Sequence, residues 1–137
     1  MGKISILIAD DHKIVRMGLK SLFAAARDLS VVGEADDGVA AVRQALRLRP
    51  DVIVMDLMMP EKDGVAATAE IHARLPEARI VVLTSYSTSD TIAAALSAGA
   101  SGAVMKSADD GTLLTAVRAV ASGETAASAL RKHLVKV

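Results

Sequence analysis

The chain has 137 residues, 52% hydrophobic and 23% charged, which excludes a disordered or low-complexity protein and fits one domain with its own core. Basic and acidic residues are equal in number, 16 of each, so no basic excess indicates a nucleic-acid-binding surface. Cysteine is absent, which excludes disulfides and thiolate metal sites, and no apolar run is long enough to cross a membrane. We therefore expect a soluble, cytoplasmic protein.

The N-terminal half predicts strands and helices in alternation. Apolar runs predict strands over 4–9, 30–35 and 51–56, and apolar residues at helical spacing predict helices over 12–27 and 39–48. The first strand ends at the paired acids Asp10 and Asp11. The third strand is apolar on both faces, as in the interior of a parallel sheet, and ends at a single carboxylate, Asp56.

The C-terminal half continues the same alternation. Strands are predicted over 79–84 and 102–105, and helices over 65–74, 89–98 and 109–121. Thr84 ends the first of these strands, and Lys106 follows the second. Five strands alternating with five helices predict an α/β protein with a doubly wound, five-stranded parallel sheet flanked by five helices.

Five polar side chains mark the predicted carboxyl ends of the strands: Asp10, Asp11, Asp56, Thr84 and Lys106. These ends share one edge of a parallel sheet, where ligands bind in open α/β folds, so we expect the side chains to converge. Three neighbouring carboxylates require a cation, and oxygen ligands favour a hard ion, Mg²⁺ or alternatively Mn²⁺. The lysine and threonine suit phosphoryl oxygens, and a carboxylate beside a metal can attack phosphorus.

Each of these residues also has a purely structural interpretation. Asp10 could cap the first helix, Thr84 could be a strand-end hydroxyl, and Lys106 could be a solvated loop lysine. Asp56 is the hardest to explain structurally, because an ionised carboxylate among apolar residues is costly. We assign no ligand role to the three histidines, which we interpret as surface or helix-capping residues: His12, His72 and His133.

These motifs resemble the receiver domain of bacterial two-component response regulators. The resemblance rests on Asp10-Asp11, the segment 56–64, Thr84-Ser85 and Lys106, which occur in the order and spacing of that family. The segments 10–12, 16–19 and 31–35 are similar to the NarL/FixJ (LuxR-type) class. The resemblance implies a flavodoxin-like receiver domain over residues 1–123. Residues 124–137 would then be a linker or the start of a C-terminal output domain that this chain lacks.

The resemblance also implies roles at the site. Asp56 would accept a phosphoryl group from the phosphohistidine of a sensor histidine kinase. Asp11 and Asp56 would bind Mg²⁺ directly, together with the backbone carbonyl of Met58, and Asp10 would act largely through water. The domain would catalyse its own phosphorylation and dephosphorylation and would not be an enzyme acting on other substrates.

Two further roles concern signalling. Lys106 would pair with the phosphoryl oxygens, and Thr84 would move to hydrogen-bond them and so shift the following loop and helix. LuxR-type regulators act on transcription through a helix-turn-helix domain, so DNA would be contacted only by such a domain. The alternative is a stand-alone receiver that signals through protein contacts. Apolar residues of the last helix, together with the first helix, could form a homodimer face or simply fill the core: Leu113, Leu114, Val117 and Val120.

The chain departs from the receiver pattern at two positions. Ala103 occupies the site of an aromatic residue whose rotation usually reports phosphorylation, and Ser107 follows the lysine where many receivers have proline. Tyr86 is the only aromatic residue near the site; it could replace the missing ring or shield the phosphoryl group from water. The usual threonine–aromatic switch therefore cannot be assumed.

Two other function classes remain open. A phosphatase of the haloacid dehalogenase type would use an aspartyl phosphate, but it places its nucleophile in an Asp-x-Asp motif after the first strand. A flavodoxin would bind flavin through a hydroxyl-rich phosphate loop, which the acids Asp10 and Asp11 contradict electrostatically.

Overall fold

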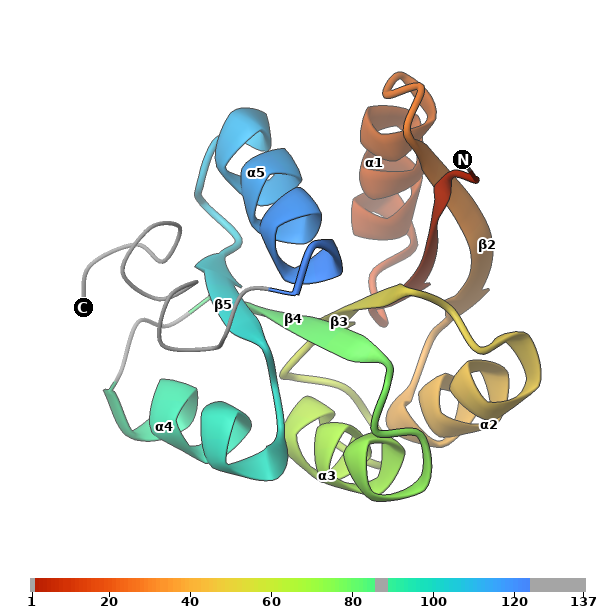
Figure 1. Ribbon diagram of the computed structural model, residues 1–137. Helices are drawn as coiled ribbons and strands as arrows, with labels where there is room; N and C mark the ends of the chain where they lie inside the picture. The colour runs from red at the N-terminus through yellow and green to blue at the C-terminus, as the bar shows by residue number, and fades with distance from the viewer. Residues whose placement is uncertain (1, 86–88, 124–137) are drawn as a thin grey trace.

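The computed structural model describes residues 2–85 and 89–123 and has three layers (Figure 1). The strands of the central sheet are β1 (Ile4–Ala9), β2 (Leu29–Ala35), β3 (Val52–Asp56), β4 (Arg79–Thr84) and β5 (Gly102–Met105). The helices are α1 (Lys13–Ala24), α2 (Gly38–Leu48), α3 (Gly64–Arg74), α4 (Ser89–Ala98) and α5 (Asp110–Ala121). Helices α1 and α5 cover one face of the sheet, and α2, α3 and α4 cover the other.

All strand pairs are parallel and the order is β2-β1-β3-β4-β5, which confirms the predicted doubly wound, flavodoxin-like sheet. Strand order reverses between β1 and β3, the point at which such sheets open a binding crevice at their carboxyl edge. Asp10 directly follows β1 and Asp56 ends β3, so the topology places these two carboxylates on either side of that point.

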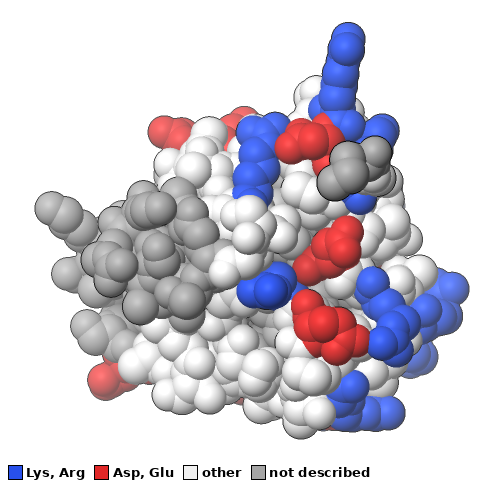
Figure 2. Space-filling model, in the orientation of Figure 1, with Lys and Arg blue, Asp and Glu red and all other residues white. Residues whose placement is uncertain are grey.

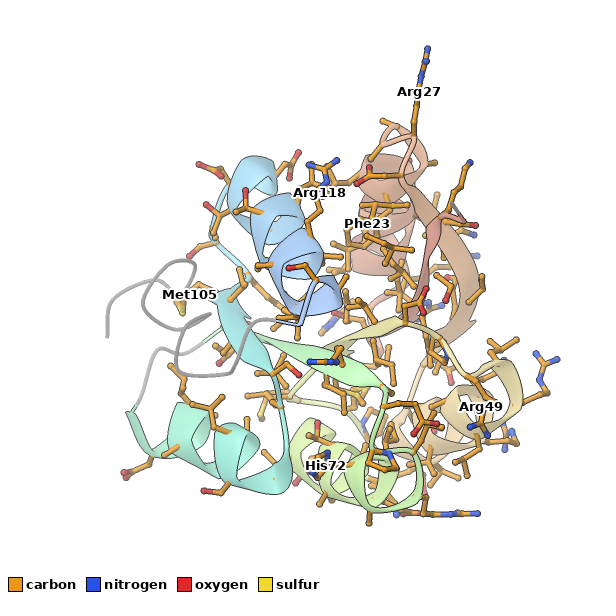
Figure 3. All side chains as sticks on the ribbon, in the orientation of Figure 1. Phe23, Arg27, Arg49, His72, Met105 and Arg118 are labelled. Carbon is orange, nitrogen blue, oxygen red and sulfur yellow. The ribbon has the colours of Figure 1, made fainter. Side chains whose placement is uncertain are left out.

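The two faces of the sheet pack into separate cores. The α2–α3–α4 side contains many alanines, including Ala41, Ala67 and Ala95, which let the helices approach the sheet closely. On the other side, Phe23 points from α1 toward α5 and is fully buried (Figure 3). This ring supplies much of the volume that aliphatic side chains fill elsewhere.

The predicted elements match the structure except around the end of α1. The helix ends at Ala24 instead of Arg27, because residues 25–28 turn back to the sheet and the Ile4 N–H donates to the Asp28 carbonyl at 2.8 Å. Strand β2 accordingly begins one residue early, at the buried Leu29. A register shift against β1 leaves Val32 without a partner, which accounts for the exposure of this apolar side chain.

The described surface shows no segregation of charge on the face seen in Figure 2, where acidic and basic side chains are interspersed. This arrangement agrees with the equal numbers of acids and bases in the sequence. None of the described helices is long and apolar enough to cross a membrane.

Gly64, at the start of α3, and Gly18, in the middle of α1, provide a matched test of close packing. A Cβ on Gly64 would lie against the Asp56 carbonyl oxygen and 2.6 Å from Leu57 Cα, both backbone atoms that cannot yield easily. A Cβ on Gly18, in the middle of α1, would meet nothing within 4 Å. Gly64 therefore permits the close approach of α3 to the end of β3.

We expect Gly64→Ala to lower the free energy of unfolding by roughly 1–3 kcal/mol, because the backbone at Asp56 must shift. Gly18→Ala should raise it by up to about 1 kcal/mol, because alanine favours a helix interior. Urea denaturation monitored by circular dichroism measures both values. Equal effects of the two substitutions would contradict the close-packing argument.

Candidate functional site

Asp10 is held at the end of β1 by bonds to its backbone and side chain. Its N–H donates to the Ala35 carbonyl of β2 at 3.0 Å, and Arg16 Nη1 donates to the Asp10 carbonyl at 2.7 Å. The residue is only 1% exposed. Asp10 is not the helix cap; His12 occupies that position, and the His12 N–H donates to Asp10 Oδ1 at 2.8 Å.

Asp56 ends β3 and is likewise 1% exposed. The next residue, Leu57, continues the sheet by donating its N–H to the Leu83 carbonyl at 3.1 Å. The chain then turns, and the Met58 N–H donates to Asp56 Oδ1 at 3.2 Å. The carboxylate therefore lies buried at the carboxyl edge of the sheet, with one oxygen bound to its own loop.

The β3–α3 loop is fixed by close backbone contacts. The Gly64 N–H donates to the Leu57 carbonyl at 3.0 Å, and a Cβ on Gly38 of α2 would lie only 2.6 Å from the Lys62 carbonyl carbon. Glu61 has a φ of 68°, a left-handed conformation that costs a non-glycine residue about 1–2 kcal/mol. The fold thus tolerates local strain to hold the loop that follows Asp56.

Lys106 joins the two buried carboxylates. Its Nζ lies 3.1 Å from both Asp10 Oδ2 and Asp56 Oδ2. Its backbone N–H donates to the Thr84 carbonyl at 2.8 Å, which ties the lysine to the end of β4. The two Nζ–Oδ2 distances are those of ion pairs. Within the described residues, neither of the two buried Oδ2 atoms accepts a hydrogen bond of good geometry. The inner oxygens therefore retain capacity for a further cation or donor.

Burial and charge act in opposite directions at this pair. Burial raises the pKa of Asp56, and the charge of Asp10 adds to this, although the Met58 N–H and the Lys106 ammonium oppose it. Burial alone would lower the pKa of Lys106, but its contacts with Asp56 and Asp10 together outweigh burial and raise it. The lysine thus stays charged, and it stabilises an Asp56 carboxylate that the apolar strand disfavours.

Three carboxylates and one imidazole gather at this edge. Single ligand atoms from Asp10, Asp11, His12 and Asp56 all lie within 4.8 Å of one another. Asp11 is the more solvent-accessible acid of the group. The single ammonium of Lys106 cannot neutralise the charge of three carboxylates. This excess negative charge and the buried Oδ2 oxygens make the cluster suitable for a divalent cation.

His12 is exposed and lies beside the two acids that follow β1. Its predicted place as a surface or capping residue is confirmed, because it occupies the cap position of α1, without a side-chain capping bond. Its Nδ1, however, lies 3.2 Å from Asp10 Oδ1 and 3.1 Å from Asp11 Oδ1. Its position directly after the two acids was the available signal of this closeness.

The remaining predicted residues surround this centre. Thr84 is buried at the end of β4 and pairs with Met105 of β5, and the side chain of Met58 is exposed at the rim. Ala103 is buried and packs in the core that lies beneath α4. Tyr86 lies outside the described residues, so its proposed substitution for the missing aromatic ring and its shielding of the site remain predictions.

Comparison with known proteins supports a common origin for these features. The family described as "Response regulator receiver domain" matches residues 6–118. The transcriptional regulatory protein LiaR of Bacillus subtilis (strain 168) is 42% identical over 121 residues, which cover 88% of this chain and 57% of LiaR. The chain thus spans little more than half the length of this relative.

Two solved structures have the same fold. A two-component response regulator of the LuxR family from Aurantimonas sp. SI85-9A1 superposes with a TM-score of 0.87 at 38% identity, covering 93% of this chain and 91% of that one. The signal receiver domain of the putative response regulator NarL from Mycobacterium tuberculosis gives 0.87 at 29% identity, covering 90% and 100%. These similarities fit the NarL/FixJ class that the sequence motifs indicated.

The raised pKa of Asp56 predicts a pH-dependent gain in stability for Asp56→Asn. Because the pKa of Asp56 is higher in the folded than in the unfolded chain, ionisation of this carboxyl destabilises the fold. The destabilisation is complete at a pH above the folded-state pKa and absent at a pH below the unfolded-state pKa. With a chelator present at neutral pH, we expect Asp56→Asn to melt at a higher temperature than the wild type. The shift should be roughly 4 °C for each kcal/mol gained in the free energy of unfolding.

This difference should shrink as pH falls through the folded pKa of Asp56 and vanish in acid below its ordinary value. Calorimetric melting curves over a pH series check it, with Glu77→Gln, at an exposed acid in the loop before β4 at the opposite edge of the sheet, as the control. A pH-independent difference between Asp56→Asn and the wild type would contradict this account of the carboxylate.

Proposed function

Because the chain belongs to the response regulator receiver family, we propose that Asp56 accepts a phosphoryl group from the phosphohistidine of a sensor histidine kinase. The observation that carries this proposal is the buried Asp56 carboxylate, in contact with Lys106 and grouped with Asp10 and Asp11. The transfer forms an O–P bond to an Asp56 oxygen and breaks the N–P bond of phosphohistidine. The imidazole nitrogen leaves with the bonding electrons.

The same residues are suited to hold a divalent cation. We assign Asp11, Asp56 and the backbone carbonyl of Met58 as ligands of Mg²⁺, or alternatively Mn²⁺, with Asp10 acting through water. The clustered carboxylates and the two buried Oδ2 oxygens support this assignment. When bound, the ion supplies positive charge for the oxygens of the transferring phosphoryl group.

Lys106 and Thr84 complete the proposed phosphoryl site. The Lys106 ammonium, already beside Asp56, pairs with the phosphoryl oxygens, and the Thr84 hydroxyl donates to them from the adjacent strand end. In this scheme the domain catalyses its own phosphorylation and dephosphorylation and does not act on other substrates. The receiver match over residues 6–118 favours this phosphoacceptor function over the haloacid dehalogenase and flavodoxin alternatives.

The proposed output is transcription regulation. LiaR is named a transcriptional regulatory protein, and this chain spans only part of its length. We propose that the receiver controls a helix-turn-helix DNA-binding domain in a longer cytoplasmic regulator, and that it contacts DNA only through that domain. The alternative is a stand-alone receiver acting through protein contacts. The assignment of residues 124–137 as a linker lies outside the described residues.

We also propose that phosphorylation promotes a homodimer through α1. Of the four apolar α5 residues considered for a dimer face, Leu113, Val117 and Val120 are buried in the core, and Leu114 is partly buried. Helix α1, in contrast, carries two exposed apolar side chains, Ile14 at 78% and Met17 at 53%. Apolar side chains this exposed on neighbouring turns suit a contact with a second copy.

Labelling by a small phosphodonor tests the phosphoacceptor. After incubation with acetyl phosphate and Mg²⁺, we expect intact-protein mass spectrometry to show one added phosphoryl group on the wild type and none on Asp56→Asn or Asp56→Ala. Asp36→Asn should be labelled like the wild type. Continued labelling of both Asp56 variants would assign the phosphoryl group to another residue and reject the proposal.

Light scattering over a concentration series tests the dimer. With beryllofluoride and Mg²⁺ as a phosphoryl mimic, the wild type should approach twice the monomer mass, whereas Ile14→Glu should stay monomeric because a carboxylate would be buried at the interface. Val39→Glu, which changes an exposed valine on α2, is the matched control and should dimerise. An unchanged wild-type mass would reject α1-mediated dimerisation.

A further inference from the structure

The His12 side chain lies against the two acids that follow β1. The backbone holds it there, because its N–H donates to Asp10 Oδ1 at 2.8 Å and the residue begins α1. Its Nδ1 approaches one oxygen of each neighbouring acid, at 3.2 Å from Asp10 Oδ1 and 3.1 Å from Asp11 Oδ1. The side chain is 62% exposed, so core packing does not account for this orientation.

The imidazole adds a different kind of donor to an otherwise all-oxygen site. Nδ1 can donate a proton to the carboxylates, or it can offer its lone pair to a cation, depending on the tautomer. Nδ1 shares a 4.8 Å cluster with ligand atoms of the three acids. Among the described residues, the second oxygens of Asp10 and Asp56 are buried with no polar contact but the Lys106 ammonium at 3.1 Å, so they can still accept a cation. Carboxylate and carbonyl oxygens suit Mg²⁺, whereas imidazole suits first-row transition metals.

We propose that His12 is a metal-specificity residue: its Nδ1 joins the carboxylates as a ligand and makes this site prefer Mn²⁺ to Mg²⁺. The proposal rests on the proposed function, since it concerns the same metal site. A purely positional role makes a different prediction. A ring that only donates to Asp10 and Asp11 orders the carboxylates for both ions equally, so its loss would leave the ratio of the two affinities unchanged.

Isothermal titration of the full chain with Mg²⁺ or Mn²⁺ alone, without phosphodonor, distinguishes the two roles. We expect His12→Ala to weaken Mn²⁺ binding about tenfold, as loss of a metal-site residue does, while Mg²⁺ affinity changes less than about twofold. His12→Asn keeps a hydrogen-bond donor near the acids but lacks the imidazole nitrogen. It should fail to restore the Mn²⁺ preference.

His72→Ala, at an exposed histidine on α3 outside the metal-ligand cluster, is the control for adventitious binding and should match the wild type. Electron spin echo measurements on bound Mn²⁺ should show coupling to an imidazole nitrogen in the wild type and in His72→Ala, and none in His12→Ala.

Two results separate failure of this inference from failure of the proposed function. If the wild type binds both ions and His12→Ala changes the two affinities equally or not at all, or if His12→Asn restores the Mn²⁺ preference, the ligand role of His12 is wrong and the metal site stands. If the wild type binds neither ion, the proposed metal site and this inference both fail. Asp56→Asn should weaken the binding of both ions.

Discussion

Lys106 places one ammonium against two carboxylates that the fold buries almost completely, Asp10 and Asp56. The two contacts, each 3.1 Å, join the ends of β1, β3 and β5, which are far apart in the sequence. Without this cation, two acids would be left at buried positions that disfavour their ionised forms. The geometry of the carboxyl edge therefore depends on keeping this ion pair intact.

The cost of the site is distributed over its surroundings. The apolar strand that ends at Asp56 raises the pKa of that carboxyl, the loop after it accepts a left-handed Glu61, and two glycines allow backbone to approach backbone. None of these features improves the core. Together they hold a carboxylate with unused acceptor capacity next to an ammonium, which is the arrangement that phosphoryl transfer and cation binding require.

The packing also limits how such a site can signal. Most of the apolar stripe of α5 is used in the core, so little of it remains for a partner. Ala103 is a small buried residue in the core beneath α4, and a methyl group has no rotamers through which it could report a change at Thr84. Helix α1 begins at Lys13, soon after Asp10 and Asp11, and it carries the exposed apolar side chains of Ile14 and Met17.

Periodicity and strand-end chemistry were sufficient to predict the class of fold, most element boundaries and the convergence of polar side chains at one edge of the sheet. Buried parallel strands have apolar sequences, and their carboxyl ends must share one edge, so the sequence predicts that Asp10, Asp56 and Lys106 meet. The early end of α1 was not predictable in this way, since alanines 24–26 suit a helix and only pairing of β2 with β1 stops it.

The placement of several other side chains was decided by the tertiary structure. The sequence by itself determined that acids, a lysine and a threonine end parallel strands, because that depends on pattern alone. Only the folded chain decided that Leu113, Val117 and Val120 belong to the core, and that the His12 ring turns onto Asp10 and Asp11. The direction of a side chain depends on neighbours distant in sequence and on the local backbone, and spacing along a chain specifies neither.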